Sequence, residues 1–348
     1  TAMIISAIVI VAYTTLGGFL AASTTDFIQS IIMSVALIVV LIFGVETAGG
    51  IGAVIHNASE LPGYLSMTLS YDVNTGKAAP YSALTIVSTA AWGLGYFGMP
   101  HILLRFMAIK DEKKLKLSRR VATIWVVISL FVAVFIGVIG YTMSKVGALE
   151  MLTGSNSETI IVKISALLSQ HGVIFALLAG VILAGILAST MSTSDSQLLA
   201  ASSAVSSDIL GAFRKDSSNK NGSMAAARIT LLVISVVAAF IARNPDSSVF
   251  AIVSFAWAGF GAAFGPVVLF SLFWKRTSKW GALAGMVCGG SMVFIWKYLI
   301  RPLGGIWNIY ELLPAFLIAC AAIVIVSLLT PKPSKEIEEE FDRVAQMK

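Results

Sequence analysis

Long apolar runs separated by shorter polar stretches are the dominant pattern of this chain. A membrane-spanning helix needs about 20 mainly apolar residues, and nine segments meet this requirement. These segments cover residues 2–21, 26–45, 83–106, 121–146, 172–197, 225–243, 248–274, 280–300 and 311–330. The pattern predicts an all-α polytopic membrane protein with about nine transmembrane helices.

Two connections and one extension add detail to this pattern. Residues 46–82 and 147–171 are the longest connections, and Ser155 and Glu158 have the spacing of a capping box. This spacing predicts a short amphipathic helix in the second connection. The fifth segment keeps a helical pattern past Gln197, too far for one bilayer crossing, and is expected to project into the cytoplasm.

The third segment contains an interruption, in the stretch AWGLGYFGMPHILLRFM (91–107). Four of its residues disfavour a regular helix: Gly93, Gly95, Gly98 and Pro100. In lipid, a broken backbone is tolerated only where it lines a cavity enclosed by protein. Trp92 and Tyr96 lie one helical turn apart beside the break, which is typical of a substrate site in a secondary transporter. A kinked packing helix is the alternative.

Composition excludes a soluble globular protein. Hydrophobic residues make up 57% of the chain and charged residues 12%, against roughly 25% charged residues in soluble domains. Cys288 and Cys320 lie inside apolar segments and indicate neither a disulfide nor a metal site. The chain begins at Thr1 without an initiator methionine, so we expect a fragment whose N-terminal part is missing.

Basic residues predict the orientation in the membrane. They gather in alternate connections and in the tail: Lys110, Lys113, Lys114, Lys116, Arg119, Arg120, Arg214, Lys215, Lys220, Lys275, Arg276, Lys279, Lys332, Lys335, Arg343 and Lys348. By the positive-inside rule these positions and the C-terminus are cytoplasmic. The net charge of +6 is therefore a topology signal and does not indicate nucleic-acid binding.

The fifth segment also carries a polar face. Four hydroxyl residues recur on one side of a helix: Ser189, Ser192, Thr193 and Ser196. Asp195 adjoins them, and Asp26 lies at the expected inner start of the second segment. Hydroxyl, carbonyl and carboxylate oxygens suit a small hard cation, so the pattern predicts a cation site. The alternatives are a packing face, a membrane-boundary position for Asp195 and a helix N-cap at Asp26.

Several stretches, in order, resemble the sodium/proline symporters of the sodium:solute symporter family. These are YTTLGGFLAASTTDFIQ (13–29), AWGLGYFGMPHILLRFMA (91–108), LASTMSTSDSQLL (187–199), SFAWAGFGAAFGPVVLFSLFW (254–274) and GALAGMVCGG (281–290). The resemblance extends over nearly the whole chain, and the combination of motifs is highly specific.

The resemblance implies a leucine-transporter-type fold, in which two inverted five-helix repeats are followed by further helices. A transmembrane domain would cover residues 1–330 and a cytoplasmic tail residues 331–348. Within the domain, 1–45 would end the first repeat, 83–274 would be the second repeat, and 280–330 would hold two trailing helices. The first four of thirteen helices would be absent from this chain.

The resemblance also implies the ligand-binding residues. The family's conserved sodium site falls on the Ser189 carbonyl and on the Ser192 and Thr193 hydroxyls. A second sodium site, present in some members, maps to Asp26, Ser192, Asp195 and Ser196, although those members have serine at the position of Asp195. The substrate contacts of proline members fall on Trp92, Tyr96 and Pro100, and Gly98 would supply freed backbone groups beside them.

These features predict a sodium-coupled symporter of L-proline that works by alternating access in the cell inner membrane. Sodium is the co-transported ion, and proline and membrane lipid are the other expected partners. The sequence holds no catalytic constellation that would indicate an enzyme, and it suggests no nucleic-acid partner and no obligate protein partner. The alternatives are a symporter of another small solute and the membrane module of a transporter-like sensor.

Overall fold

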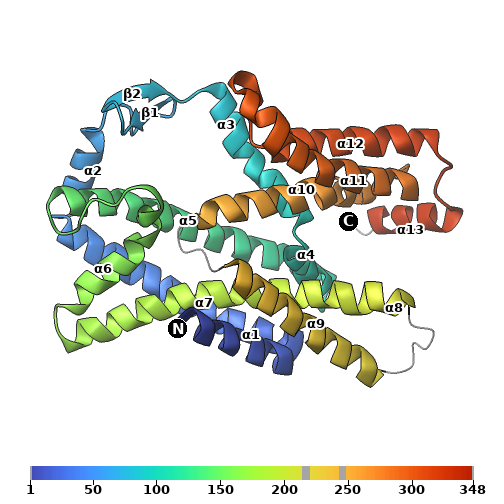
Figure 1. The fold of residues 1–348 in the computed structure, drawn as a ribbon, viewed down its shortest axis with the longest axis horizontal. Coiled ribbons are helices and arrows are strands. Elements are labelled where there is room, and N and C mark those ends of the chain that lie inside the picture. The colour runs from blue at the N-terminus through green and yellow to red at the C-terminus, as the bar shows by residue number, and fades with distance from the viewer. Residues whose placement is uncertain (1, 214–219, 243–247, 347–348) are drawn as a thin grey trace. The chain divides into compact units, whose positions relative to one another are not determined.

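The computed structural model describes residues 2–213, 220–242 and 248–346 of the chain (Figure 1). Its helices and strands are α1 (Ala2–Thr47), α2 (Ile51–Ser59), β1 (Leu69–Asp72), β2 (Lys77–Pro80), α3 (Ala83–Ala90), α4 (Pro100–Met107), α5 (Leu115–Lys145), α6 (Ile160–Ser169), α7 (Val173–Ser203), α8 (Leu210–Phe213), α9 (Lys220–Ile241), α10 (Val249–Phe273), α11 (Lys279–Ile295), α12 (Leu312–Leu329) and α13 (Lys335–Gln346). Shorter 3₁₀ segments include η1 (Ala91–Gly98) and η3 (Gly154–Thr159), and π-helical turns are η4 (Ala204–Ile209) and η5 (Trp296–Ile300). Arg214, Lys215 and Lys348 of the basic clusters lie outside the described residues.

Two compact units make up the chain, and each is described by itself. Unit 1 consists of Thr1–Leu65, Val73–Lys77 and Ile109–Ser247. Unit 2 consists of Ser66–Asp72, Ala78–Ala108 and Ser248–Lys348. The division into repeats at residues 1–45, 83–274 and 280–330 stays a prediction.

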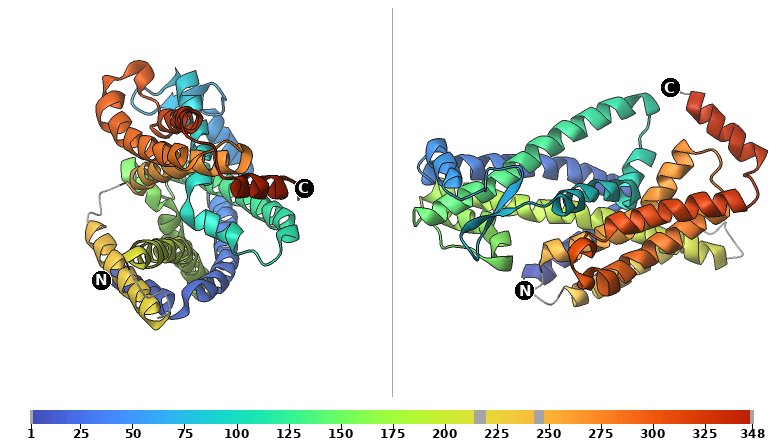
Figure 2. Two further views of the ribbon diagram at one scale, coloured as in Figure 1. Left: turned by 90° about the vertical axis from the view of Figure 1, so that its right-hand side faces the viewer. Right: turned by 90° about the horizontal axis from the view of Figure 1, so that it is seen from above.

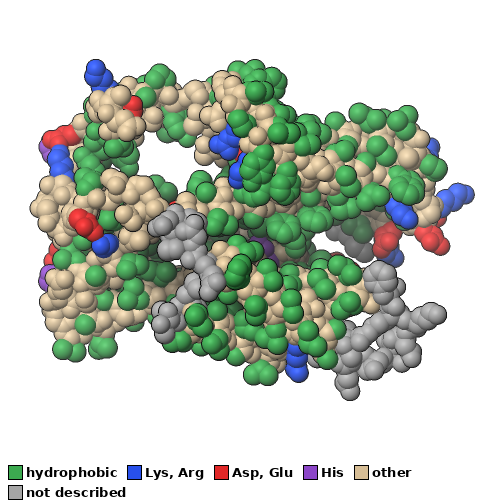
Figure 3. Space-filling model, in the orientation of Figure 1, with side chains coloured by type: hydrophobic (Ala, Val, Ile, Leu, Met, Phe, Trp, Pro, Cys, Tyr) green, Lys and Arg blue, Asp and Glu red, His purple; other side chains and the backbone are tan. Residues whose placement is uncertain are grey.

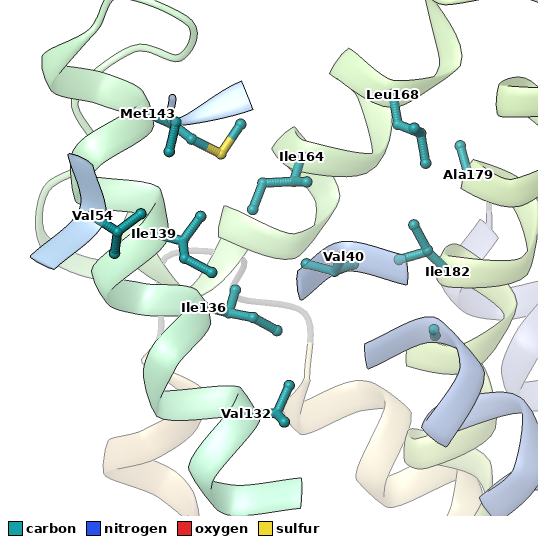
Figure 4. Packing of buried hydrophobic residues seen from close by; sticks show 12 residues of the cluster. Val40, Val54, Val132, Ile136, Ile139, Met143, Ile164, Leu168, Ala179 and Ile182 are labelled. Carbon is teal, nitrogen blue, oxygen red and sulfur yellow. The ribbon is translucent and has the colours of Figure 1, made fainter. Parts of the chain in front are cut away.

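Unit 1 is built on the packing of α1 against α7, with α5, α6 and α9 beside them. Its hydrophobic core joins side chains of the long helices α1, α5 and α7 and of the shorter α2 and α6 (Figure 4). Ile136, Ile139 and Ile182 are at most 1% exposed there. A Cβ atom added at Gly185 would lie 2.7 Å from the Cβ of Ala36, so glycine is what allows α7 to approach α1 this closely.

The surface of the helices suits a lipid environment. Six helical segments among the described residues are long and apolar enough to cross a membrane: Ile4–Thr47, Glu112–Lys145, Val173–Ile209, Val249–Phe273, Lys279–Leu303 and Leu312–Leu329. Large apolar side chains such as Leu16, Val173 and Leu329 are 78%, 79% and 81% exposed. Hydrophobic side chains cover much of the visible face in Figure 3, and few charged side chains lie among them. The protein is therefore a multi-pass membrane protein, as its composition predicts.

The nine predicted segments all contain helix, but α1 differs from the expected pair of helices. The predicted boundary at residues 22–25 is wrong, because these residues continue the helix and the interruption lies at Gly18, with φ 60° and ψ −153°. This backbone conformation is essentially restricted to glycine. The hydroxyls of Thr24 and Thr25 donate to the carbonyls of Leu20 and Ala21, at 2.9 and 3.0 Å. These polar side chains are satisfied inside a helix and need no loop.

Three further expectations have mixed outcomes. The amphipathic helix of the second long connection is present as α6, but the predicted capping box is wrong, since Ser155 and Glu158 lie in η3 and Thr159 precedes α6. The fifth predicted segment continues past Gln197 to the end of α7 and into η4 and α8, as expected. The predicted tail contains α13, and Lys275 before α11 pairs with Asp342 of that helix at 2.5 Å.

Unit 2 is organised by α10, α11 and α12. Helices α11 and α12 run side by side in both views of Figure 2, where they are orange to red. Gly281 and Gly285 face α12 so closely that an added Cβ atom would lie 1.9 Å from Ser327 Oγ and 2.4 Å from Ile323 Cγ1. At Gly289 it would lie 2.2 Å from the Ala262 carbonyl of α10. The glycine spacing of α11 therefore serves helix packing.

Candidate functional site: cation and substrate regions

The hydroxyl residues of α7 form a continuous polar strip in unit 1. Ser192 and Ser196 are half-buried, whereas Ser189 and Thr193 are exposed. Thr193 Oγ1 donates to the Ser189 carbonyl at 3.2 Å, and Ser196 Oγ donates to the Ser192 carbonyl at 2.9 Å. The helix therefore brings the three predicted ligands of the first sodium site to one strip, where the Thr193 and Ser196 hydroxyls each donate to a carbonyl one turn earlier.

The geometry of this strip is compatible with cation binding. A hard cation lies about 2.4 Å from its oxygen ligands, so two ligand oxygens of one ion are separated by roughly 3.4 Å when they meet at a right angle. Thr193 Oγ1 and the Ser189 carbonyl oxygen, 3.2 Å apart, match this separation. A hydroxyl oxygen that donates its hydrogen to a helix carbonyl keeps its lone pairs for an ion. The same hydroxyl can therefore make this hydrogen bond and bind a cation.

Asp195 is a buried carboxylate in unit 1. Its side chain is 0% exposed. Tyr13 Oη of α1 donates to Asp195 Oδ2 at 2.7 Å, and Ser196 Oγ donates to Asp195 Oδ1 at 3.3 Å. Asp26 of α1 interacts electrostatically with Asp195, and a second ion site at these two carboxylates stays a prediction.

Two details of this region differ from the predictions made from the sequence. Asp26 is not a helix N-cap, because α1 runs without a start at that position. Tyr13 was missed as a partner of Asp195, although it opens the first family-like stretch. The two residues are 182 positions apart in the chain, and helical spacing relates only neighbours within a few turns.

The break in the third predicted span is present in unit 2. Helix α3 ends at Ala90, the backbone continues as the 3₁₀ segment η1, and Met99 is extended with φ −81° and ψ 112°. Pro100 then begins α4 at a position where proline removes no helical hydrogen bond. A 3₁₀ segment of 8 residues is unusually long and often marks a strained or functional part of a helix.

Glycines let η1 lie directly on α10. A Cβ atom at Gly95 would be 1.9 Å from Trp257 Nε1, and one at Gly98 would be 2.3 Å from the Phe260 carbonyl oxygen. Gly98 is buried and Pro100 half-buried. The predicted break is therefore both an interruption and a close helix contact, and the substrate site beside it stays a prediction.

Aromatic rings surround the first half of the break. The ring of Trp92 is stacked with those of Phe250, Trp257 and Tyr310, with centroid distances of 5.5, 5.6 and 5.8 Å. Trp257 Nε1 also donates to the Trp92 carbonyl at 2.9 Å. Tyr96 is 46% exposed and meets Trp257 edge to face at 4.8 Å.

The expected one-turn spacing of Trp92 and Tyr96 is wrong in detail. In a 3₁₀ helix, residues four apart are separated by about 120° around the axis, because three residues complete a turn. Trp257 of α10 contacts both rings and joins them instead. Trp257, Phe250 and Tyr310 were missed as members of this region, since they come from α10 and from the loop before α12.

Comparisons with known proteins agree with this architecture. Residues 1–289 match the Sodium:solute symporter family. The chain is 38% identical to the osmoregulated proline transporter OpuE and 39% identical to the high-affinity proline transporter PutP, both of Bacillus subtilis. These matches cover 94% and 96% of the chain but only 63% and 66% of the relatives. A sodium/proline symporter of Haemophilus influenzae is 39% identical over 99% of the chain and 66% of its own length.

A solved structure provides the corresponding match in fold. It is a Na⁺-coupled sialic acid symporter in a substrate-bound outward-open state, with a TM-score of 0.73 and 17% identity. The match covers 96% of this chain and 67% of that protein, and supports the leucine-transporter-type fold predicted above. The family and these relatives are transporters and not enzymes. The family match over residues 1–289 and the identity to these relatives show that the chain belongs to the sodium:solute symporter family.

Proposed function

We propose that the natural protein carries L-proline together with sodium across the cytoplasmic membrane by alternating access. The observation that carries this proposal is the break at η1, where Trp92 and Tyr96 adjoin freed backbone. An apolar ring of proline would lie against these side chains. Its carboxylate would lie at the start of α4, where the helix dipole favours an anion. The similarity to proteins named as proline transporters supports this choice of solute.

Sodium would bind to the polar strip of α7. The Ser189 carbonyl and the hydroxyls of Ser192 and Thr193 would hold the first ion. Asp26, Asp195, Ser192 and Ser196 would hold a second. Basic residues that flank alternate spans support a cytoplasmic C-terminus.

Uptake of labelled L-proline into proteoliposomes tests the proposal. With an inward sodium gradient we expect accumulation, and with choline in place of sodium we expect none. Unlabelled L-proline should compete, whereas sialic acid, the solute named for the structural neighbour, should not. Sodium-driven uptake of labelled sialic acid without uptake of proline would overturn proline in favour of another solute, and a lack of any solute flux would favour the sensor alternative.

Removing either aromatic ring at the break should weaken proline binding. In Trp92→Ala and Tyr96→Ala we expect about a tenfold or larger loss of affinity, because each ring contributes apolar contact worth about 1.5–3 kcal/mol when buried. Equilibrium binding of labelled proline to purified protein measures this, with sodium binding measured separately. Trp280→Ala is the control, since this indole is 54% exposed at the start of α11. Unchanged proline affinity in both variants would remove the substrate site from η1.

Neutralising the buried carboxylates should change the sodium stoichiometry. Asp195→Asn keeps an oxygen that accepts from Tyr13 but removes the negative charge of the side chain. Asp26→Asn likewise removes the negative charge of the second carboxylate. We expect one fewer sodium ion per proline in each variant, measured from the reversal potential of coupled transport. Asp208→Asn, which alters an exposed carboxylate in η4, should keep the original ratio. Wild-type stoichiometry in both test variants would exclude the second ion.

A further inference from the structure

An ion cluster around the buried carboxylate of Glu311 closes the loop between α11 and α12 in unit 2. The side chain of Glu311 is 2% exposed, and its Oε2 accepts from Arg301 Nη1 at 2.9 Å. Lys297 Nζ lies 3.9 Å from Glu311 Oε1 and 3.8 Å from the centre of the Phe255 ring. Arg301 Nε also donates to Asn308 Oδ1 at 3.0 Å. A buried carboxylate is tolerated only with such partners, so the cluster favours one conformation of this loop.

Tyr310, next to Glu311, connects this loop to three other segments. Its backbone N–H donates to Ser88 Oγ of α3 at 2.5 Å, and its hydroxyl donates to the Ser254 carbonyl of α10 at 2.6 Å. Its ring stacks on Trp92 of η1, with an interplanar angle of 16°. Two directional hydrogen bonds therefore determine where this ring lies against Trp92.

Two segments, α10 and the loop before α12, contact Trp92. Trp257 of α10 stacks on its ring and donates to its carbonyl, and Tyr310 stacks on the same ring from the loop. The position of the Trp92 indole thus depends on Tyr310. The same residue also contacts Ser88 of α3, which lies 222 positions away in the chain. Parallel offset stacking of this kind is sensitive to small displacements of either ring.

We propose that Tyr310 and Glu311 are positioning residues for the substrate region: the ion cluster of Glu311 fixes the loop, and Tyr310 transmits this position to the Trp92 ring. This inference rests on the proposed role of Trp92 in solute binding. Tyr310 and Glu311 set the affinity for the solute without contacting it, and they have no part in sodium binding. Their effect has its own spectroscopic readout, because near-ultraviolet circular dichroism reports the fixed packing of aromatic side chains such as Trp92 and Trp257.

The test compares Tyr310→Leu, Tyr310→Phe and Glu311→Gln in the protein in its longest natural form. The band of interest is the circular dichroism signal that is lost in Trp92→Phe. Tyr310→Leu and Glu311→Gln should reduce this band and weaken proline binding about three- to tenfold, as expected for a lost aromatic pair, with unchanged sodium affinity. Tyr310→Phe keeps the ring and should retain most of the circular dichroism band and most of the proline affinity. Glu150→Gln, which removes a 66% exposed carboxylate paired with Lys163, is the matched control.

The outcomes separate this inference from the proposed function. Loss of thermal stability in Glu311→Gln with a wild-type band and wild-type proline affinity would overturn the positioning role, and so would a parallel loss of proline and sodium affinity in Tyr310→Leu. If Glu311→Gln does not fold, the two Tyr310 variants decide the question. If the wild-type protein binds no proline, the proposed function fails, whereas the circular dichroism band still tests the link from Glu311 to Trp92.

Discussion

Gly98→Ala is expected to destabilise unit 2 by about 3 kcal/mol, the upper end of the usual cost of overpacking. The added Cβ atom would lie 2.3 Å from the Phe260 carbonyl oxygen, 2.8 Å from the Gly265 nitrogen and 2.9 Å from the Gly261 Cα. All three neighbours are backbone atoms of α10, which no side-chain rotation can move. Either η1 must separate from α10 or α10 must bend.

Unfolding of the purified protein in detergent, followed by circular dichroism, measures this effect. Gly93→Ala is the matched control, because it lies in the same 3₁₀ segment and its added Cβ atom meets no heavy atom of the described residues within 4 Å. We expect it to change the unfolding free energy by no more than about 0.5 kcal/mol. Equal stability of the two variants would show that η1 does not depend on close contact with α10.

Thr193→Val is expected to raise the sodium concentration needed for half-maximal proline binding about tenfold or more. Valine keeps the branched shape of threonine and removes the hydroxyl oxygen that lies 3.2 Å from the Ser189 carbonyl. Loss of one good polar partner costs about 1–3 kcal/mol, and about 1.4 kcal/mol corresponds to a tenfold change in affinity. Because Thr193 is exposed and adds little to the core, the fold should be unaffected.

Two controls make the sodium experiment specific. Thr190→Val removes a hydroxyl that donates to the Ile186 carbonyl at 3.1 Å and is not among the predicted sodium ligands, and it should leave the sodium dependence unchanged. Thr193→Ser keeps the oxygen and should restore most of the affinity. Equal sodium dependence of the wild type and Thr193→Val would mean that the strip is only a packing face with back-bonded hydroxyls.

The interruption in α1 shows where a local sequence pattern fails to predict the end of a helix. The predicted segments 2–21 and 26–45 leave a boundary at residues 22–25, yet Thr24 and Thr25 bond back to their own helix. Gly18, which adjoins a second glycine in an apolar run, carries the break instead. Serine and threonine are ambiguous because their hydroxyls are satisfied equally well by water in a loop and by a carbonyl one turn earlier.

The sequence by itself determined three features of this protein. These are the apolar runs of about 20 residues, the interruption by glycine and proline, and the one-face spacing of Ser189, Ser192, Thr193 and Ser196. Each depends on neighbours within a few turns, where backbone geometry is regular. Only the tertiary structure decided that Tyr13 donates to Asp195 and that Tyr310 stacks on Trp92. These pairs bring together side chains from distant segments, and such contacts depend on how whole helices pack rather than on the period of any one of them.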